Sequence, residues 1–110
     1  MNTIPPHTHP LPNKVTLVEV GLRDGIQREA QFVPTARKLA FIQGFVAAGV
    51  KEIQVTSFVN PKIVPQMADA EAVCAALPPA EGVTYSALVL NLKGLDRAAA
   101  AGLRKVDMGL

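Results

Sequence analysis

The sequence has no tryptophan, one cysteine and a net charge of only +2, and it has no long apolar run. A single cysteine forms no disulfide within the chain, so we expect a reducing compartment, and the cytoplasm fits best. The basic residues form no cluster typical of a nucleic-acid-binding surface. No apolar run approaches the ~20 residues of a membrane-spanning helix. We therefore expect neither a nucleic acid nor a membrane as a partner.

Apolar residues nevertheless make up 49% of the 110 residues. This share excludes global disorder, and the length is enough for one modest domain. Residues 1–13 differ from the rest because they hold four of the nine prolines and show no strand or helix periodicity. We interpret them as a flexible arm and residues 14–110 as the folded part. His7 and His9 form an H-x-H pair in this arm, which we interpret as solvated rather than metal-binding.

Strand and helix patterns alternate from Lys14 onward. The expected strands cover residues 15–20, 52–56, 83–89 and 105–110, and the expected helices cover residues 34–49, 70–77 and 92–101. Helical crossovers favour a parallel sheet. Two α/β architectures begin this way: a small doubly wound sheet, and a (β/α)₈ TIM barrel of about 250 residues. Because the fourth strand has only just begun where the sequence stops, we expect the N-terminal part of a barrel, roughly (βα)₃β.

Polar residues gather where the expected strands end, and in parallel α/β folds these carboxyl ends share one edge of the sheet. The three segments cover residues 21–27, 56–62 and 91–94. In the first, the guanidinium of Arg23 is suited to stabilise negative charge that develops on oxygen. The adjacent Asp24 is a hard oxygen ligand suited to Mg²⁺ or Mn²⁺. A surface ion pair beside a turn glycine is the alternative interpretation of this pair.

The segments VEVGLRDGIQ, VTSFVNPKIVPQMADAE and NLKG together resemble the hydroxymethylglutaryl-CoA lyase family. The resemblance runs from about Lys14 to Leu110 without an obvious gap. An R-D-G run alone also occurs in Claisen-type synthases and related aldolases, but the E-V-G lead-in and the S-F-V-x-P-K-x-V-P-Q-M run are similar to the lyases. The resemblance implies a TIM-barrel enzyme that cleaves 3-hydroxy-3-methylglutaryl-CoA, or a similar acyl-CoA, by retro-aldol chemistry to acetyl-CoA and acetoacetate.

The resemblance also implies roles for residues at the three strand ends. Arg23 would stabilise the enolate formed on carbon–carbon cleavage, and Asp24 would be a ligand of a divalent cation, Mg²⁺ or Mn²⁺. These two are the expected catalytic residues. The expected substrate-binding residues are Arg23, Gln27, Ser57, Phe58 and Asn91. The implied partner is an acyl-CoA substrate, and we expect the full-length enzyme to be a homo-oligomer.

Two departures from the family pattern bear on the chemistry, whereas Leu22 in place of a proline bears on the rigidity of the loop. Gln54 stands where these lyases usually have glutamate, which removes one negative charge and predicts an altered substrate or weaker activity. The family's H-x-H metal ligands and reactive cysteine lie beyond Leu110, so we expect this chain alone to be inactive. Cys74 is interpreted as a small core residue, and Glu19 as a carboxylate that supports the site. We interpret Lys62 as solvated, with contact to the phosphates of CoA as the alternative.

Two further functions stay open at this point. The first is another R-D-G barrel that performs aldol or Claisen chemistry on a different acid. The second is a small, non-catalytic α/β module that binds a nucleotide or a partner protein. The absence of a G-x-G-x-x-G or P-loop run after the first strand disfavours nucleotide binding.

Overall fold

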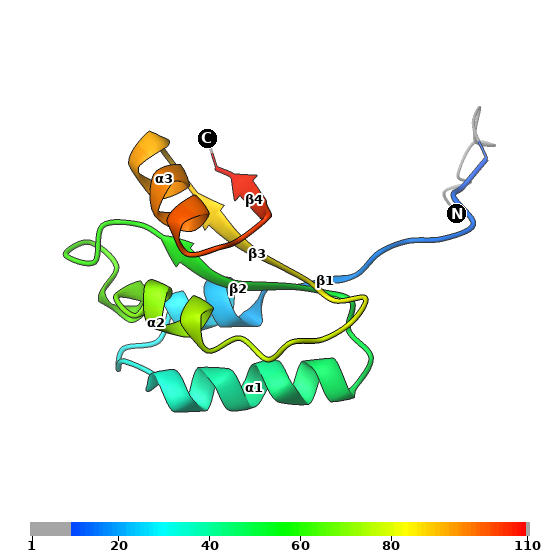
Figure 1. Cartoon of the computed structure of the whole chain (residues 1–110), viewed down its shortest axis with the longest axis horizontal. Helices are drawn as coiled ribbons and strands as arrows, with labels where there is room; N and C mark the ends of the chain where they lie inside the picture. Colours follow the sequence, from blue (N-terminus) through cyan, green and yellow to red (C-terminus); the bar gives the residue numbers. More distant parts are fainter. Residues whose placement is uncertain (1–9, 110) are drawn as a thin grey trace, which may run out of the picture.

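The computed structural model describes residues 10–109, in which a four-stranded parallel sheet carries three α-helices (Figure 1). The strands are β1 (Val18–Glu19), β2 (Glu52–Phe58), β3 (Thr84–Val89) and β4 (Lys105–Met108). The helices are α1 (Thr35–Ala47), α2 (Ala70–Ala75) and α3 (Leu92–Ala100), with a π-helical turn η1 (Gly21–Gly25) and a 3₁₀ turn η2 (Pro65–Met67). None of these helices in residues 10–109 has the length and hydrophobicity that crossing a bilayer requires. Most of the expected arm, including His7 and His9, lies outside the described residues.

The strand order distinguishes the two expected architectures. The strands lie in the order β1-β2-β3-β4, and each neighbouring pair is parallel. Right-handed crossovers that all advance in one direction place their helices on the same face of the sheet. A doubly wound sheet reverses direction and carries helices on both faces. The barrel-type expectation is therefore confirmed, and the doubly wound alternative is wrong for the described residues.

The two faces of the sheet differ in chemistry. The helix face, on which α1, α2 and α3 pack, carries buried apolar side chains from alternate strand positions: Ile53, Phe58, Ala87 and Val89. The opposite face, which we call the open face, carries mostly polar side chains: Glu52, Gln54 and Ser57 of β2, Ser86 and Leu88 of β3, and Lys105 and Asp107 of β4. In a TIM barrel the helices form the outer ring, so this polar face would line the barrel interior.

A buried ion pair ties α1 to the loop that follows β2. Lys38 is 1% exposed, and its Nζ lies 2.6 Å from Oδ1 of Asp69 and donates to the backbone oxygen of Gln66 over 2.6 Å. The hydroxyl of Thr35 donates to Oδ2 of the same aspartate over 2.6 Å. Because a buried charge is stable only when it is paired and hydrogen-bonded, this cluster fixes the loop against α1.

Three expected elements differ from the structure. The first strand is two residues long rather than residues 15–20, because only Val18 and Glu19 pair with β2. The polar segment after it begins with the helical turn η1 rather than an irregular loop. The second strand ends at Phe58 rather than Thr56, so Ser57 and Phe58 lie within the strand and not after it. A bulge between Gln54 and Thr56 breaks the strand's alternation, which explains the early predicted end.

Candidate active site

The turn after β1 is shaped by its own backbone and by one carboxylate. The backbone oxygen of Val20 accepts hydrogen bonds from the amides of Arg23 (3.1 Å) and Asp24 (2.7 Å). Oε1 of Glu19 accepts from the amide of Gly21 over 2.8 Å. A Cβ at Gly21 would lie 2.8 Å from that same oxygen, so a larger residue would displace the carboxylate. Glu19 thus stabilises the turn that presents the two expected catalytic residues.

Arg23 is held more firmly than Asp24. Its Nε donates to Oε1 of Gln54 over 2.7 Å, and its Nη1 lies 3.5 Å from Oδ1 of Asp24. The side chain of Arg23 is 21% exposed, whereas that of Asp24 is 47% exposed and also lies 3.6 Å from Nη2 of the exposed Arg28. The turn therefore presents a positioned cation beside a more accessible carboxylate, and the adjacency expected from the sequence is present.

The residue that positions Arg23 is itself part of a longer network. Gln54 is 4% exposed, and its Nε2 donates to Oδ2 of Asp107 over 2.7 Å. The hydroxyl of Ser86 donates to the same oxygen over 3.2 Å. The network thus runs from β2 across β3 to β4 on the open face. Sequence reasoning missed Asp107 and Ser86, and only the register of the three strands would have indicated them.

The four expected substrate-binding residues other than Arg23 lie around one cavity. This edge cavity has a volume of about 190 Å³ at the carboxyl ends of β2 and β3, and its lining includes Gln27, Ser57, Phe58 and Asn91. Apolar side chains, including Leu88 and Leu90, form much of the remaining wall. A mostly apolar cavity with a few polar groups is typical of a small-molecule site. Arg23 and Asp24 are not part of this lining and lie at the neighbouring end of β1.

Three of these residues also have structural roles. Asn91 is the N-cap of α3, and its Oδ1 accepts from the amide of Gly94 over 2.8 Å. The hydroxyl of Ser57 donates to the backbone oxygen of Leu88 over 3.2 Å. Phe58 is 1% exposed and lies beneath the guanidinium of Arg97, 5.2 Å from the ring centre. The wall of the edge cavity is therefore held rigidly by secondary structure.

A second, larger cavity lies at the same edge and is bordered by cations. This lysine cavity has a volume of about 480 Å³, and Lys62, Lys93 and Arg97 are among its lining residues. The guanidinium of Arg97 is engaged, since its Nε lies 2.7 Å from Oε2 of Glu71 and its Nη1 donates to the backbone oxygen of Val59. The hydrogen bond from Arg97 lowers the pKa of Glu71. The two lysines thus provide the positive charge available to an anionic ligand.

The described residues do not form a complete metal centre. Residues 10–109 contain no group of three or more histidine, cysteine, aspartate or glutamate side chains placed to hold an ion. Asp24 is a hard oxygen ligand, but the charges nearest to it are two guanidinium groups, those of Arg23 and Arg28. Within residues 10–109, Asp24 is therefore an accessible carboxylate that belongs to no group of three or more such ligand side chains.

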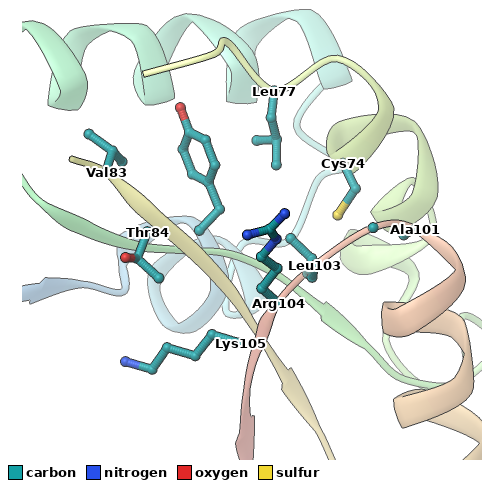
Figure 2. Close-up of a pocket in the computed structure, with 10 residues that line it drawn as sticks. Cys74, Leu77, Val83, Thr84, Ala101, Leu103, Arg104 and Lys105 are labelled. Carbon is teal, nitrogen blue, oxygen red and sulfur yellow. The ribbon is translucent and has the colours of Figure 1, made fainter. Parts of the chain in front are cut away.

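Cys74 lies away from this edge. It borders a cavity of about 480 Å³ between the ends of α2 and α3 and the amino ends of β3 and β4 (Figure 2). The cysteine is 8% exposed, and burial, followed by the charge of Glu71, raises the pKa of its thiol to about 11. A thiol with so high a pKa is a poor nucleophile. The structure thus places Cys74 as a buried packing residue, at the end of the sheet opposite Arg23.

Comparison with known proteins relates this arrangement to lyases. A 3-hydroxy-3-isohexenylglutaryl-CoA/hydroxymethylglutaryl-CoA lyase of Pseudomonas aeruginosa is 49% identical over 96 residues, which are 87% of this chain and 32% of that enzyme. A solved hydroxymethylglutaryl-CoA lyase from Pseudomonas aeruginosa superimposes with a TM-score of 0.84 at 48% identity, covering 89% of this chain and 33% of that one. An HMG-CoA lyase from Acinetobacter baumannii, solved with coenzyme A and 3-methylmalate, superimposes with a TM-score of 0.81 at 34% identity, covering 84% and 30%.

The chain spans about a third of the length of the curated relatives that it matches. The superpositions on whole lyase structures agree with the strand order in assigning the sheet to part of a TIM barrel. The model of the HMGL-like family matches residues 14–110, which is nearly all of the chain. The chain therefore belongs to the HMGL-like family.

Proposed function

We propose that the protein that contains this chain is a carbon–carbon lyase that cleaves a 3-hydroxy-3-methylglutaryl-CoA-like acyl-CoA to acetyl-CoA and a keto acid. The observation that carries the proposal is the placement of Arg23, which Gln54 holds at the carboxyl edge of the sheet beside Asp24. The names of the relatives, all acyl-CoA lyases, support the same reaction class. The alternative of a non-catalytic binding module has no comparable support.

The proposed reaction is a retro-aldol cleavage. A base takes the proton of the tertiary hydroxyl, the bond between the hydroxyl-bearing carbon and the carbon next to the thioester breaks, and the electron pair passes to the thioester as an enolate. The former hydroxyl carbon becomes the ketone of acetoacetate, and a proton added to the enolate carbon gives acetyl-CoA. Negative charge develops on the thioester oxygen, and a fixed guanidinium is suited to stabilise that charge. This is the role that we assign to Arg23.

We assign Asp24 as the one ligand that this chain contributes to a divalent cation, Mg²⁺ or Mn²⁺. A carboxylate oxygen suits either ion, and a bound cation would supply Lewis-acid polarisation of a substrate oxygen. Because the described residues form no complete centre, we expect the 110-residue chain by itself to be inactive. Removal of divalent cations with EDTA is expected to abolish cleavage by the whole enzyme, and added Mg²⁺ or Mn²⁺ is expected to restore it.

The two cavities at the carboxyl edge suit the two parts of an acyl-CoA. The edge cavity, with Gln27, Ser57, Phe58 and Asn91 in its lining, would enclose the acyl group. The lysine cavity, with Lys62 and Lys93, would hold the phosphates of CoA. The Acinetobacter baumannii enzyme, which was solved with coenzyme A, supports a CoA substrate. The homo-oligomeric state stays a prediction, as does the cytoplasmic location, since several relatives are named as mitochondrial enzymes.

The test is a cleavage assay on the protein purified from its own cells, with its intact mass measured first. Formation of acetyl-CoA and acetoacetate from 3-hydroxy-3-methylglutaryl-CoA, dependent on a divalent cation, is the expected result. Acyl-CoA analogues with a longer substituent at carbon 3 test whether the substrate is altered. Aldol or Claisen activity toward another acid, with no cleavage of any of these thioesters, would replace this proposal with the alternative R-D-G chemistry.

A further inference from the structure

The substitution at position 54 is expected to remove a negative charge from the site, yet the structure supplies one close by. The resemblance to the lyases predicts a carboxylate at this position, and the chain has the neutral Gln54. Directly behind it lies the carboxylate of Asp107, whose Oδ2 accepts a 2.7 Å hydrogen bond from Nε2 of Gln54. The charge is thus present on the open face, displaced from β2 to β4.

We propose that Gln54 and Asp107 act together as the positioning unit for Arg23, with Asp107 as the carboxylate that neutralises the guanidinium through the amide of Gln54. The proposal deepens the lyase function given above and rests on it only where activity is the readout. It assigns a role to Asp107, a residue that no motif in the sequence indicated.

The polarity of the amide makes this arrangement specific. A glutamine has a carbonyl that only accepts and an NH₂ group that only donates. Here the carbonyl faces the cation, accepting from Nε of Arg23 over 2.7 Å, and the NH₂ group faces the anion. The side chain has one orientation that satisfies both neighbours, and it is 4% exposed, so it has little freedom to leave that orientation.

Partial burial of the Asp107 carboxylate strengthens its electrostatic effect on Gln54 and Arg23. Charges interact more strongly away from water, where the effective dielectric constant is lower. The other carboxylate next to Arg23, that of Asp24, is 47% exposed and lies at 3.5 Å. Asp107 is half-buried, and Ser86 fixes its carboxylate with a second hydrogen bond of 3.2 Å. It is therefore placed to hold Gln54, and through it Arg23, in one geometry.

The same geometry predicts that the amide at position 54 and the carboxylate at position 107 can be exchanged only if both residues are changed together. A glutamate at position 54 would place two carboxylates at the distance of the present 2.7 Å hydrogen bond, and like charges at this distance repel. An asparagine at position 107 keeps a hydrogen-bond acceptor but removes the charge. Gln54→Glu combined with Asp107→Asn restores one carboxylate and one amide, with the carboxylate now in direct contact with Arg23.

The experiment is a double-mutant cycle in the protein as expressed from its own gene, with Gln54→Glu, Asp107→Asn and the double variant. Each single variant is expected to lower kcat by about tenfold or more, the effect of losing one charge-assisted contact. The double variant is expected to recover to within about threefold of the parent enzyme, because the charge balance is restored. The matched control is Glu52→Gln, since Glu52 pairs with Lys105 over 3.0 Å and also links β2 to β4. It is expected to change kcat by less than about threefold.

A second readout is independent of turnover. The ¹H–¹⁵N resonance of the Arg23 Nε, identified by its loss in Arg23→Lys, reports directly on the hydrogen bond to Gln54. It is expected to shift in both single variants, to return to a hydrogen-bonded position in the double variant, and to stay unchanged in Glu52→Gln. If the protein cleaves no thioester, the proposed function fails but this readout still decides the inference.

The result that would overturn the inference is a double variant that shows no recovery. A double variant no better than the worse single variant, or a Glu52→Gln variant as impaired as Asp107→Asn, would show that Asp107 acts only as a structural link. Should Asp107→Asn not fold, Gln54→Met breaks the same connection while it keeps both charges and the side-chain size. A normal kcat and an unshifted Arg23 resonance in Gln54→Met would equally refute the role.

Discussion

Nε of Arg23 donates a 2.7 Å hydrogen bond to Oε1 of Gln54, so a side chain from the turn after β1 is held by the middle of β2. The turn alone would leave a long, flexible side chain without a fixed direction. With Nε engaged, the two terminal nitrogens lie at a defined distance from the sheet, and one of them reaches Asp24. A catalytic cation that must meet developing charge benefits from this kind of preorganisation.

The first prediction concerns this cation. Arg23→Gln in the whole enzyme is expected to cost about 3–4 kcal/mol of transition-state stabilisation, the effect of removing an oxyanion donor. The fold is expected to be unchanged even though the hydrogen bond to the buried Gln54 is lost, because the Arg23 side chain is partly exposed and lies outside the apolar core. The measurement is kcat/KM together with a urea unfolding curve. Arg37→Gln on the exposed side of α1 is the control, and a near-normal rate for Arg23→Gln would refute the assignment.

The second prediction concerns the buried pair of Lys38 and Asp69. Lys38→Met is expected to lower the free energy of unfolding by about 3–5 kcal/mol, because it leaves a largely buried carboxylate without its cation. The comparison is Lys105→Met, which breaks the more exposed pair with Glu52 and is expected to cost about 1 kcal/mol or less. Equal effects in chemical denaturation would show that burial does not govern the Lys38 pair.

The third prediction concerns the contact between α3 and β2. A Cβ at Gly94 would lie 2.6 Å from the backbone oxygen of Phe58, so Gly94→Ala is expected to destabilise the fold by about 1–3 kcal/mol. In α1, a Cβ at Gly44 would meet nothing within 4 Å. Gly44→Ala is therefore expected to stabilise the protein by about 0.5–1 kcal/mol. Thermal unfolding of both variants is the measurement, and Tm is expected to fall in Gly94→Ala and to rise in Gly44→Ala. A change of Tm in the same direction in both variants would contradict this prediction.

The fourth prediction concerns Cys74 and alkaline pH. The pKa of its thiol rises from 9.0 to about 11 on folding, so the folded state keeps the proton at a pH where the unfolded chain has released it. Stability is therefore expected to fall as the pH rises from about 9 toward about 11. Cys74→Ala is expected to flatten this part of the curve of unfolding free energy against pH. An unchanged slope in the variant would show that the thiol titrates as it does in the unfolded chain.

Reactivity gives a second check on the same thiol. Alkylation of native Cys74 by iodoacetamide at pH 8 is expected to be much slower than alkylation in urea, because the thiolate is the reacting form. Equal alkylation rates in the native and the urea-unfolded protein would mean that Cys74 is not buried and that the pKa of its thiol is not raised.

Local patterns were enough to predict most of the fold. The strand pattern of residues 83–89 and the helical spacing of α1 are signals within ten to fifteen residues. Grouping the polar strand ends on one edge was also correct, since Gln27, Ser57, Phe58 and Asn91 line one cavity. This grouping follows from the rule that the carboxyl ends of parallel strands lie at the same edge of the sheet.

Long-range partners could not be predicted in this way. Gln54 and Asp107 are 53 positions apart, and Lys38 and Asp69 are 31 apart, so no local pattern links either pair. A lysine in a helix is ordinarily interpreted as solvated, because burial depends on a partner that only the folded chain brings near. The sequence therefore predicted which segments form the candidate site. The hydrogen-bond network that positions Arg23 could be found only from the register of the three strands β2, β3 and β4.

The bulge in β2 changes which residues of the strand face each side of the sheet. Before it, Gln54 is paired with Ser86 and faces the polar side. After it, Thr56 is paired with Ala87, so the next polar-side residue is Ser57, three positions along rather than two. A regular strand that kept all seven residues of β2 would instead place Ser57 on the helix face and Phe58 on the polar side. The one extra residue at the bulge therefore keeps the aromatic ring of Phe58 in the core and the hydroxyl of Ser57 on the polar side.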